Sequence, residues 1–243
     1  MIIVNADDWG CTRNDTDKAL SCYRKDRITS VSAMVFMEDS CRAADLANDI
    51  GIDVGLHLNL DQSFTGKTNL PQLDEYHNRV NRFFKVNKYA FLFYNPALRS
   101  QFRYVYQAQV EEFMRLYERP PSHIDGHHHL HLCANMLMDN IIPKHEKVRR
   151  NFSFWPGEKN FLNRTYRYLI DIWLAKRYIL TDYFLDLSQC LKTQNLARVA
   201  ELSRTATVEL MTHPANSYEY AYLMSDNHIG ILHKLGKGTY ALL

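Results

Sequence analysis

The sequence has little net charge and no apolar run long enough to cross a membrane. Its 243 residues carry a formal net charge of +2, and 46% of them are hydrophobic. This near-balance gives no electrostatic reason to expect a nucleic-acid partner, which basic patches usually recognise. No apolar stretch approaches the ~20 residues of a membrane span, and Met1 leads directly into a short strand-like segment without a basic leader. We therefore expect a cytoplasmic protein that contacts neither nucleic acid nor membrane.

Cysteine is scarce and scattered. The five cysteines are odd in number, and none forms a Cys-x-x-Cys pair. This pattern argues against a disulfide framework and against a zinc finger. Cys133, two residues past His131, is the cysteine nearest to the histidine-rich segment, and we expect it to be buried structure. The chain also lacks a glycine-rich loop of the kind that cradles phosphates.

Histidine, in contrast, is concentrated in one place. Five of the eleven histidines fall within residues 123–131, namely His123, His127, His128, His129 and His131. Histidine is the commonest protein ligand for metals, and Asp125 lies inside the run. Ile124 and Leu130 interrupt it, which is typical of a strand that ends in a loop. The run predicts a metal site, although its composition does not indicate which histidine would bind.

Segments typical of strands alternate with segments typical of helices along most of the chain. The predicted strands cover residues 1–5, 29–36, 54–60, 147–151, 181–185 and 207–212, and one more begins at Ser122. The predicted helices cover residues 14–25, 40–49, 96–117, 135–146, 160–177 and 191–203. This alternation indicates βαβ units, a mostly parallel sheet and the α/β class. Because α/β barrels commonly have this length, we expect a single domain over residues 1–243.

Residues 61–90 break the alternation. Gly66, Pro71 and many polar residues predict an irregular segment, and residues 83–93 are rich in aromatic side chains. Long excursions within a compact domain are usually functional. We therefore expect residues 61–106 to form an insertion near the active site, over one end of the sheet.

Acidic residues or histidines follow four of the predicted strands. Asp7 and Asp8 follow the first strand, His57 lies near the end of the third, His127 opens the triple histidine, and His213 ends the last. Active sites of parallel α/β proteins gather at the carboxyl ends of strands, so we expect these side chains to converge. Each also has a structural interpretation: the Asp pair can cap a helix, His57 can be a core histidine, and His213 can simply end a strand.

Two histidines and one carboxylate form a common site for a divalent metal with open coordination positions, as hydrolytic sites need. A bound ion lowers the pKa of its water towards neutrality and can polarise a carbonyl oxygen. Of Asp7 and Asp8, one carboxylate would bind the ion and the other would accept the proton of the water. Asp125, two residues before His127, is the candidate to orient a metal-bound histidine.

Four segments of the chain resemble the YdjC-like carbohydrate deacetylases, a family that includes the chitooligosaccharide deacetylases. They are residues 4–10, 54–60, 123–131 and 209–214, in the order and spacing of the family. The resemblance implies a distorted (β/α) barrel of mostly parallel strands, with the active site at their carboxyl ends. It implies removal of an acetyl group from an N-acetylated sugar or oligosaccharide, with one divalent ion, magnesium or zinc. It also implies that two copies can pair as a homodimer.

Position by position, the resemblance assigns Asp8, His57 and His127 to the metal. Asp7 matches the general base, and His213 matches the histidine that acts as general acid. The remaining histidines of the run would then be structural or would support the ligands.

Trp9, Trp155 and Arg149 are further candidates for contact with substrate. The two tryptophans could stack on the apolar face of a sugar ring, although tryptophan is also a common core residue. Arg149 could hydrogen-bond a polar substrate, orient Asp7, or be a solvated charge at a strand end. Two other functions stay open: a metallophosphoesterase, which Asp and His can also build, and a non-catalytic sugar- or metal-binding protein on the same scaffold.

Overall fold

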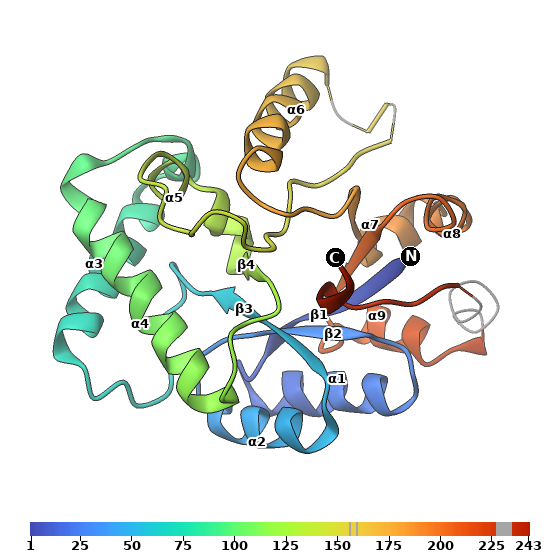
Figure 1. The fold of residues 1–243 in the computed structure, drawn as a ribbon, viewed down its shortest axis with the longest axis horizontal. Helices are drawn as coiled ribbons and strands as arrows, with labels where there is room; N and C mark the ends of the chain where they lie inside the picture. Colours follow the sequence, from blue (N-terminus) through green and yellow to red (C-terminus); the bar gives the residue numbers. More distant parts are fainter. Residues whose placement is uncertain (156, 159, 227–234) are drawn as a thin grey trace. The chain divides into compact units, whose positions relative to one another are not determined.

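The computed structural model describes residues 1–155, 157–158, 160–226 and 235–243 (Figure 1). Among these residues, six strands alternate with helices: β1 (Ile2–Trp9), β2 (Ser30–Ala33), β3 (Asp53–Leu58), β4 (Ile124–Gly126), β5 (Tyr183–Asp186) and β6 (Val208–Thr212). Their order is β4-β3-β2-β1-β6-β5, and the β1–β6, β3–β4 and β5–β6 pairs are parallel. This order confirms the predicted fold class, an α/β protein of the distorted (β/α) barrel type.

The chain divides into two compact units. The terminal unit comprises residues 1–7, 17–31 and 145–243, and the middle unit comprises residues 8–16 and 32–144. The boundaries fall inside β1, helix α1 (Arg13–Arg24) and β2. The single domain over residues 1–243 stays a prediction. Across the described residues, no helix combines the length and apolar character needed to cross a membrane.

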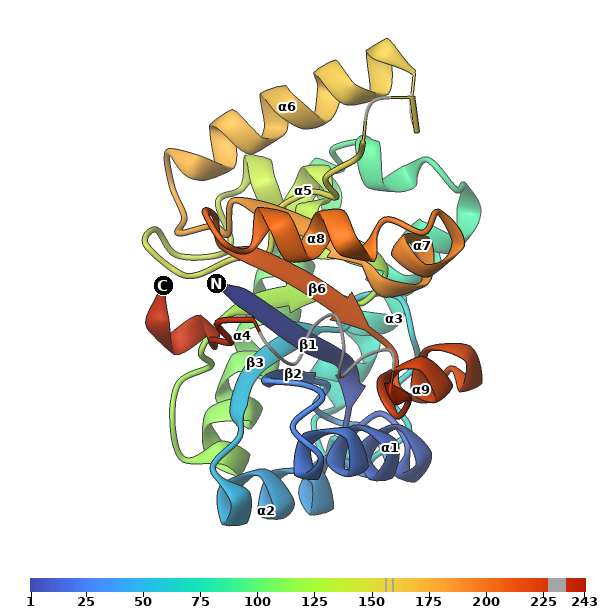
Figure 2. The ribbon, with the colours of Figure 1, turned by 90° about the vertical axis from the view of Figure 1, so that its right-hand side faces the viewer.

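The terminal unit is built on β1 and β6. The two strands pair from Ile2 opposite Val208 to Ala6 opposite Thr212. Residues 2–7 are buried, as expected for an apolar run in a parallel sheet whose two faces are covered. Among its described residues, the helices of this unit are most of α1, α6 (Phe161–Ala175), α7 (Leu187–Lys192), α8 (Leu196–Leu202), α9 (Ser217–Leu223) and the 3-10 turn η4 (Tyr240–Leu242) (Figure 2).

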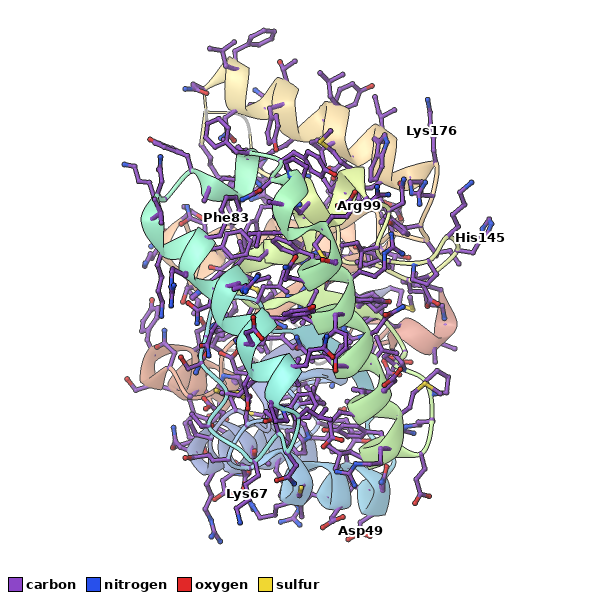
Figure 3. All side chains as sticks on the ribbon, turned by 90° about the vertical axis from the view of Figure 1, so that its left-hand side faces the viewer. Asp49, Lys67, Phe83, Arg99, His145 and Lys176 are labelled. Carbon is purple, nitrogen blue, oxygen red and sulfur yellow. The ribbon has the colours of Figure 1, made fainter. Side chains whose placement is uncertain are left out.

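The middle unit pairs β3 with β4. Its helices are α2 (Ser40–Ile50), α3 (Pro71–Val86), α4 (Arg99–Tyr117) and α5 (Ala134–Met138), with the 3-10 segments η1 (Ala90–Leu92), η2 (Pro96–Leu98) and η3 (His127–Leu132). Helices α3 and α4 lie side by side (Figure 3), and the rings of Phe84 and Phe102 are 5.8 Å apart. Helix α2 ends at Gly51, whose left-handed φ of 66° is easiest for glycine.

The prediction of an irregular segment over residues 61–90 is wrong, because α3 occupies residues 71–86. Leu73, His77 and Val80 are buried at helical spacing. Pro71 stands at the start of the helix, where the missing N–H would have no intrahelical partner. Proline at this position begins the helix rather than breaking it. The many polar residues obscured the helical spacing of the apolar ones.

The helix predicted over residues 135–146 is also too long. Helix α5 ends at Met138, and Asn140 has a left-handed φ of 49°. Pro143 follows and cannot donate the hydrogen bond that a continuing helix would need. The backbone therefore leaves the helix after little more than one turn.

Two predictions in the terminal unit differ as well. Of the strand predicted over residues 147–151, only Lys147 and Val148 form bridges, and Lys147 pairs with Ile179. The helix predicted over residues 191–203 is replaced by α7 and α8. Gln194, with a left-handed φ of 55°, separates them.

Candidate metal centre

Asp8, His57 and His127 meet in the middle unit. Asp8 lies near the end of β1, His57 lies in β3, and His127 opens η3 directly after β4. Nδ1 of His127 is 3.1 Å from Oδ1 of Asp8, and Nε2 of His57 is 3.4 Å from the same oxygen. One possible ligand atom from each residue lies within 4.8 Å of the others. These are the residues that the resemblance assigns to the metal.

The backbone places these side chains in uncommon conformations. The register of β3 and β4 puts Leu58 opposite Gly126, so His127 leaves the sheet just past the end of β3. Asp8 has a φ of 65°, and His128 and His129 have φ values of 52° and 58°. Left-handed backbone costs a non-glycine residue about 1–3 kcal/mol and clusters at functional sites. Such residues lie in two of the three segments that supply Asp8, His57 and His127.

The charge state of Asp8 suits a metal ligand. Burial alone would raise the pKa of its carboxyl group, but hydrogen bonds with His127 and His57 outweigh burial and hold the pKa well below its ordinary range. Its side chain is 19% exposed, and that of His127 is 15% exposed. An ionised carboxylate between two imidazoles, reachable from solvent, is a donor set for a divalent cation.

The two distances from Asp8 fit a tetrahedral ion. Zinc bonds of about 2.0–2.1 Å place neighbouring ligand atoms about 3.3 Å apart. The two distances from Asp8 Oδ1, 3.1 Å to His127 and 3.4 Å to His57, bracket that value. Zinc binds imidazole nitrogen and carboxylate oxygen alike, whereas magnesium prefers oxygen ligands in an octahedron. The three side chains could therefore hold a divalent ion.

Asp125 supports His57 rather than its sequence neighbour His127. Its Oδ1 lies 2.8 Å from Nδ1 of His57, and its side chain is fully buried. A carboxylate in this position accepts the Nδ1 proton and leaves Nε2 to face Asp8. The sequence indicated a supporting role for Asp125, but the register of β3 and β4, with His57 opposite Asp125, decides which histidine it touches.

The other residues of the histidine run differ in surroundings. His128 Nδ1 is 2.7 Å from Oδ2 of Asp61, and this hydrogen bond raises the pKa of His128. His131 is fully buried. Cys133 is buried, as predicted, and burial raises the pKa of its thiol to about 12.

Asp7 and Arg149 form a buried ion pair in the terminal unit. Nη1 and Nη2 of Arg149 each donate to one oxygen of Asp7, both at 2.7 Å. Asn5 Nδ2 adds a hydrogen bond of 2.9 Å to Oδ1 of Asp7. Arg149 is fully buried, so it is not a solvated charge at a strand end. The paired donors restrain both carboxylate oxygens of Asp7.

A second buried carboxylate completes this cluster. Nε of Arg149 donates to Oε1 of Glu209 at 2.8 Å, and the hydroxyl of Tyr240 hydrogen-bonds to the other oxygen, Oε2. Neither Glu209 nor Tyr240 was predicted from the sequence to be part of the site. A charged residue inside the apolar strand that became β6 was the available signal, since an acid there needs a buried partner.

His213 directly follows β6 in the terminal unit and is partly exposed. Its backbone N–H donates to Oε2 of Glu219 at 2.7 Å. The same oxygen accepts the hydroxyl of Thr212 at 2.7 Å, and Ser188 donates to Oε1. Glu219 thus anchors the backbone at His213.

The two tryptophans have different surroundings. Trp9 is fully buried and its Nε1 donates to the carbonyl of Ala43, so it has no surface to offer a sugar. Trp155 is partly exposed, with the Arg198 guanidinium 4.1 Å from its ring centre. It lines a cavity of about 230 Å³ in the terminal unit, together with residues such as Phe152 and Asp186.

The fold and these clusters define a class: a parallel α/β protein with an Asp-His-His cluster that could bind a metal. The model of the YdjC-like protein family matches residues 1–232 of the 243, and the chain belongs to this family.

Several proteins with similar sequences are named as deacetylases. A chitooligosaccharide deacetylase of Proteus mirabilis (strain HI4320) is 30% identical over 138 residues, covering 56% of this chain and 52% of the relative. A carbohydrate deacetylase of Halalkalibacterium halodurans is 26% identical over 222 residues, covering 88% of this chain and 84% of the relative. The match to the first of these spans about half of its length.

One solved structure shares the fold. The crystal structure of a proposed cellobiose-phosphate cleavage protein from Enterococcus faecalis V583 superposes with a TM-score of 0.69, over 98% of this chain and 97% of the other. The two sequences are 18% identical, so the likeness concerns the fold alone.

Proposed function

We propose that this protein is a metal-dependent hydrolase that removes an acetyl group from an N-acetylated sugar or oligosaccharide. The observation that carries the proposal is the Asp8–His57–His127 cluster, whose spacing suits one ion. The names of the deacetylase relatives support the substrate class. The chemistry is hydrolysis of an amide, which needs an activated water, charge stabilisation and a protonated leaving amine.

A divalent ion held by Asp8, His57 and His127 would supply Lewis acidity and a water of lowered pKa. Asp7 takes the proton of the attacking water as general base. Arg149 holds both of its oxygens, which keeps the carboxylate oriented. His213 donates a proton to the leaving amine as general acid. A positioned acid or base typically contributes about 10²–10⁴-fold to the rate.

Acetate release from N-acetylglucosamine oligomers, with and without a chelator, tests the proposal. We expect release by the metal-loaded protein, its loss on chelation, and its return when zinc is added. His57→Ala should lose both metal and activity. The control is His145→Ala, which should keep both, because the side chain of His145 is exposed and points outward (Figure 3). Phosphate release from a phosphodiester would instead indicate a metallophosphoesterase. Sugar binding without either product would indicate a non-catalytic binding protein.

A further inference from the structure

The cavity of about 230 Å³ in the terminal unit lies at the carboxyl end of β5. Asp186, the last residue of β5, lines it, and so do Gln189 and Cys190 of the following helix α7. The other lining residues are Phe152, Ser153, Phe154, Trp155, Glu158, Leu185 and Thr193. Pockets for drug-sized ligands usually enclose about 300–1,000 Å³, so this smaller cavity suits a single ring. We call it the Trp155 cavity.

The segment that carries the aromatic rings of the cavity is fixed to β5. The backbone N–H of Ser153 donates to the carbonyl of Phe184 at 2.7 Å, and the backbone N–H of Phe184 donates to the Ser153 hydroxyl at 3.1 Å. The rings of Phe152 and Phe184 stack with their centres 4.5 Å apart. The backbone N–H of Trp155 donates to Oε2 of Glu158 at 2.7 Å. A wall held in this way loses little conformational freedom when a ligand binds, which favours affinity.

Trp155 offers an aromatic surface to the cavity. The Arg198 guanidinium lies 4.1 Å from the centre of the Trp155 ring, but Arg198 does not line the cavity. The indole therefore meets the cavity with a part of its surface that Arg198 leaves uncovered. Phe152 and Phe154 add two further rings to the same wall. A flat ring can stack on the C–H face of a sugar, while polar groups nearby bind the sugar hydroxyls.

Two carboxylates give the cavity its polar character. Oδ1 of Asp186 accepts the backbone N–H of Gln189 at 2.6 Å and caps α7, whereas Oδ2 has no hydrogen-bond partner among the described residues. Glu158 uses Oε2 for Trp155. No lysine or arginine lines the cavity, and neither carboxylate forms a salt bridge with another described residue. Because ionised carboxylates only accept hydrogen bonds, the fitting ligand carries hydroxyl or ammonium donors and no negative charge.

The Trp155 cavity lies at the edge of the sheet where His213 follows β6. The strands β5 and β6 are parallel, and their register sets Asp186 opposite Met211, two residues before His213. Figure 2 shows α7 and α9 near the end of β6. Ser188 of α7 donates to Oε1 of Glu219, whose Oε2 accepts the backbone N–H of His213. One carboxylate therefore joins the helix that lines the cavity to the backbone at His213.

In the proposed reaction, His213 protonates an amine that is bonded directly to a sugar ring. That ring, or the ring linked to it, must lie close to His213. We propose that the Trp155 cavity is a subsite for one neutral or amine-bearing sugar ring of the oligosaccharide, with Trp155 as its stacking surface and Asp186 as the acceptor of its hydrogen bonds. The inference deepens the proposed function and rests on it for the choice of ligand.

Calorimetric titration with glucose, glucosamine and glucuronate tests the charge preference, because none of the three carries an acetyl group to be released. We expect the wild type to bind glucose and glucosamine, and to bind the negatively charged glucuronate at least about tenfold more weakly. Asp186→Asn should narrow this difference to about threefold or less, since it removes one charge and asparagine still caps the helix. The control is Asp182→Asn, which should bind as the wild type does, because Asp182 accepts from the backbone N–H of Thr207 outside the cavity.

Trp155→Ala tests the stacking surface in the complete reaction, with Trp173→Ala as the matched control. Trp173 is also half-buried in the terminal unit, and the Arg177 guanidinium lies 5.3 Å from its ring centre, but it does not line the cavity. We expect Trp155→Ala to raise the KM for N-acetylglucosamine oligomers about five- to tenfold at nearly unchanged kcat. Trp155→Phe should raise it less, and the control should leave both constants unchanged.

Three results would overturn the subsite. They are a wild type that binds neither glucose nor glucosamine, glucuronate binding as tight as glucose binding, and a KM within about twofold of wild type in Trp155→Ala. If Trp155→Ala does not fold, Trp155→Phe and Asp186→Asn decide the question. A wild type that binds glucose, loses this binding in Trp155→Ala and releases no acetate would refute the proposed function and leave the subsite supported. Acetate release with an unchanged KM in Trp155→Ala would refute the subsite alone.

Discussion

Arg149→Met should destabilise the protein far more than the loss of an ordinary salt bridge. The guanidinium is fully buried between Asp7 and Glu209, with three hydrogen bonds of 2.7–2.8 Å. Methionine fills a similar volume but leaves two buried carboxylates without their cation. Breaking a buried ion pair from one side typically costs about 3–5 kcal/mol. That is a large share of the roughly 5–15 kcal/mol by which a domain is stable.

Urea unfolding measures this loss as a shift of the midpoint at unchanged slope. The matched control is Arg115→Met, which breaks a salt bridge with Glu112 whose arginine is 62% exposed. Exposed pairs of this kind contribute about 0–1 kcal/mol. The triple variant Arg149→Met/Asp7→Asn/Glu209→Gln should recover part of the loss, because it removes the stranded charges as well. If Arg149→Met costs no more than Arg115→Met, the reasoning from buried charge is wrong.

Three further predictions concern the reaction, pH and one helix end. Asp7→Asn should reduce acetate release by about 10²–10⁴-fold while zinc stays bound; near-normal turnover would remove Asp7 as the base. Burial lowers the pKa of His77 to about 4, below the ~6.5 of an unfolded histidine. The unfolded chain then takes up the proton first, so the contribution of His77 to stability should be constant above pH 6.5 and fall by roughly 3 kcal/mol between pH 6.5 and 4. His77→Leu should flatten this dependence in urea titrations. Gly51→Ala, at a φ of 66°, should lower the thermal midpoint at a cost of about 1 kcal/mol, whereas Asn48→Ala, inside the same helix, should change it little.

Local pattern was sufficient for most of the strands, because a buried parallel strand has the pattern of a short apolar run between turn residues. Residues 54–60 and 207–212 correspond closely to β3 and β6. The same approach failed for α3, where Pro71 looked like a break although it begins the helix. It also failed for α5, which ends early at the left-handed Asn140.

By itself, the sequence determined the α/β class and the residue types of the candidate metal site. Asp8, His57 and His127 were selected because strand ends carry the functional residues of such folds and because the motifs resemble one family. The structure places their ligand atoms within 4.8 Å of one another. Their individual roles stay proposals.

Only the tertiary structure decided which partners these residues have. Asp125 supports His57 because β3 and β4 pair in a register that sets them opposite each other. Arg149 is buried between Asp7 and Glu209, residues 142 and 60 positions away in the chain. Such contacts depend on strand register and burial, and neither leaves a local signal in the sequence. A sequence pattern reports which groups are present, whereas hydrogen bonding and charge pairing require distances that only the folded backbone sets.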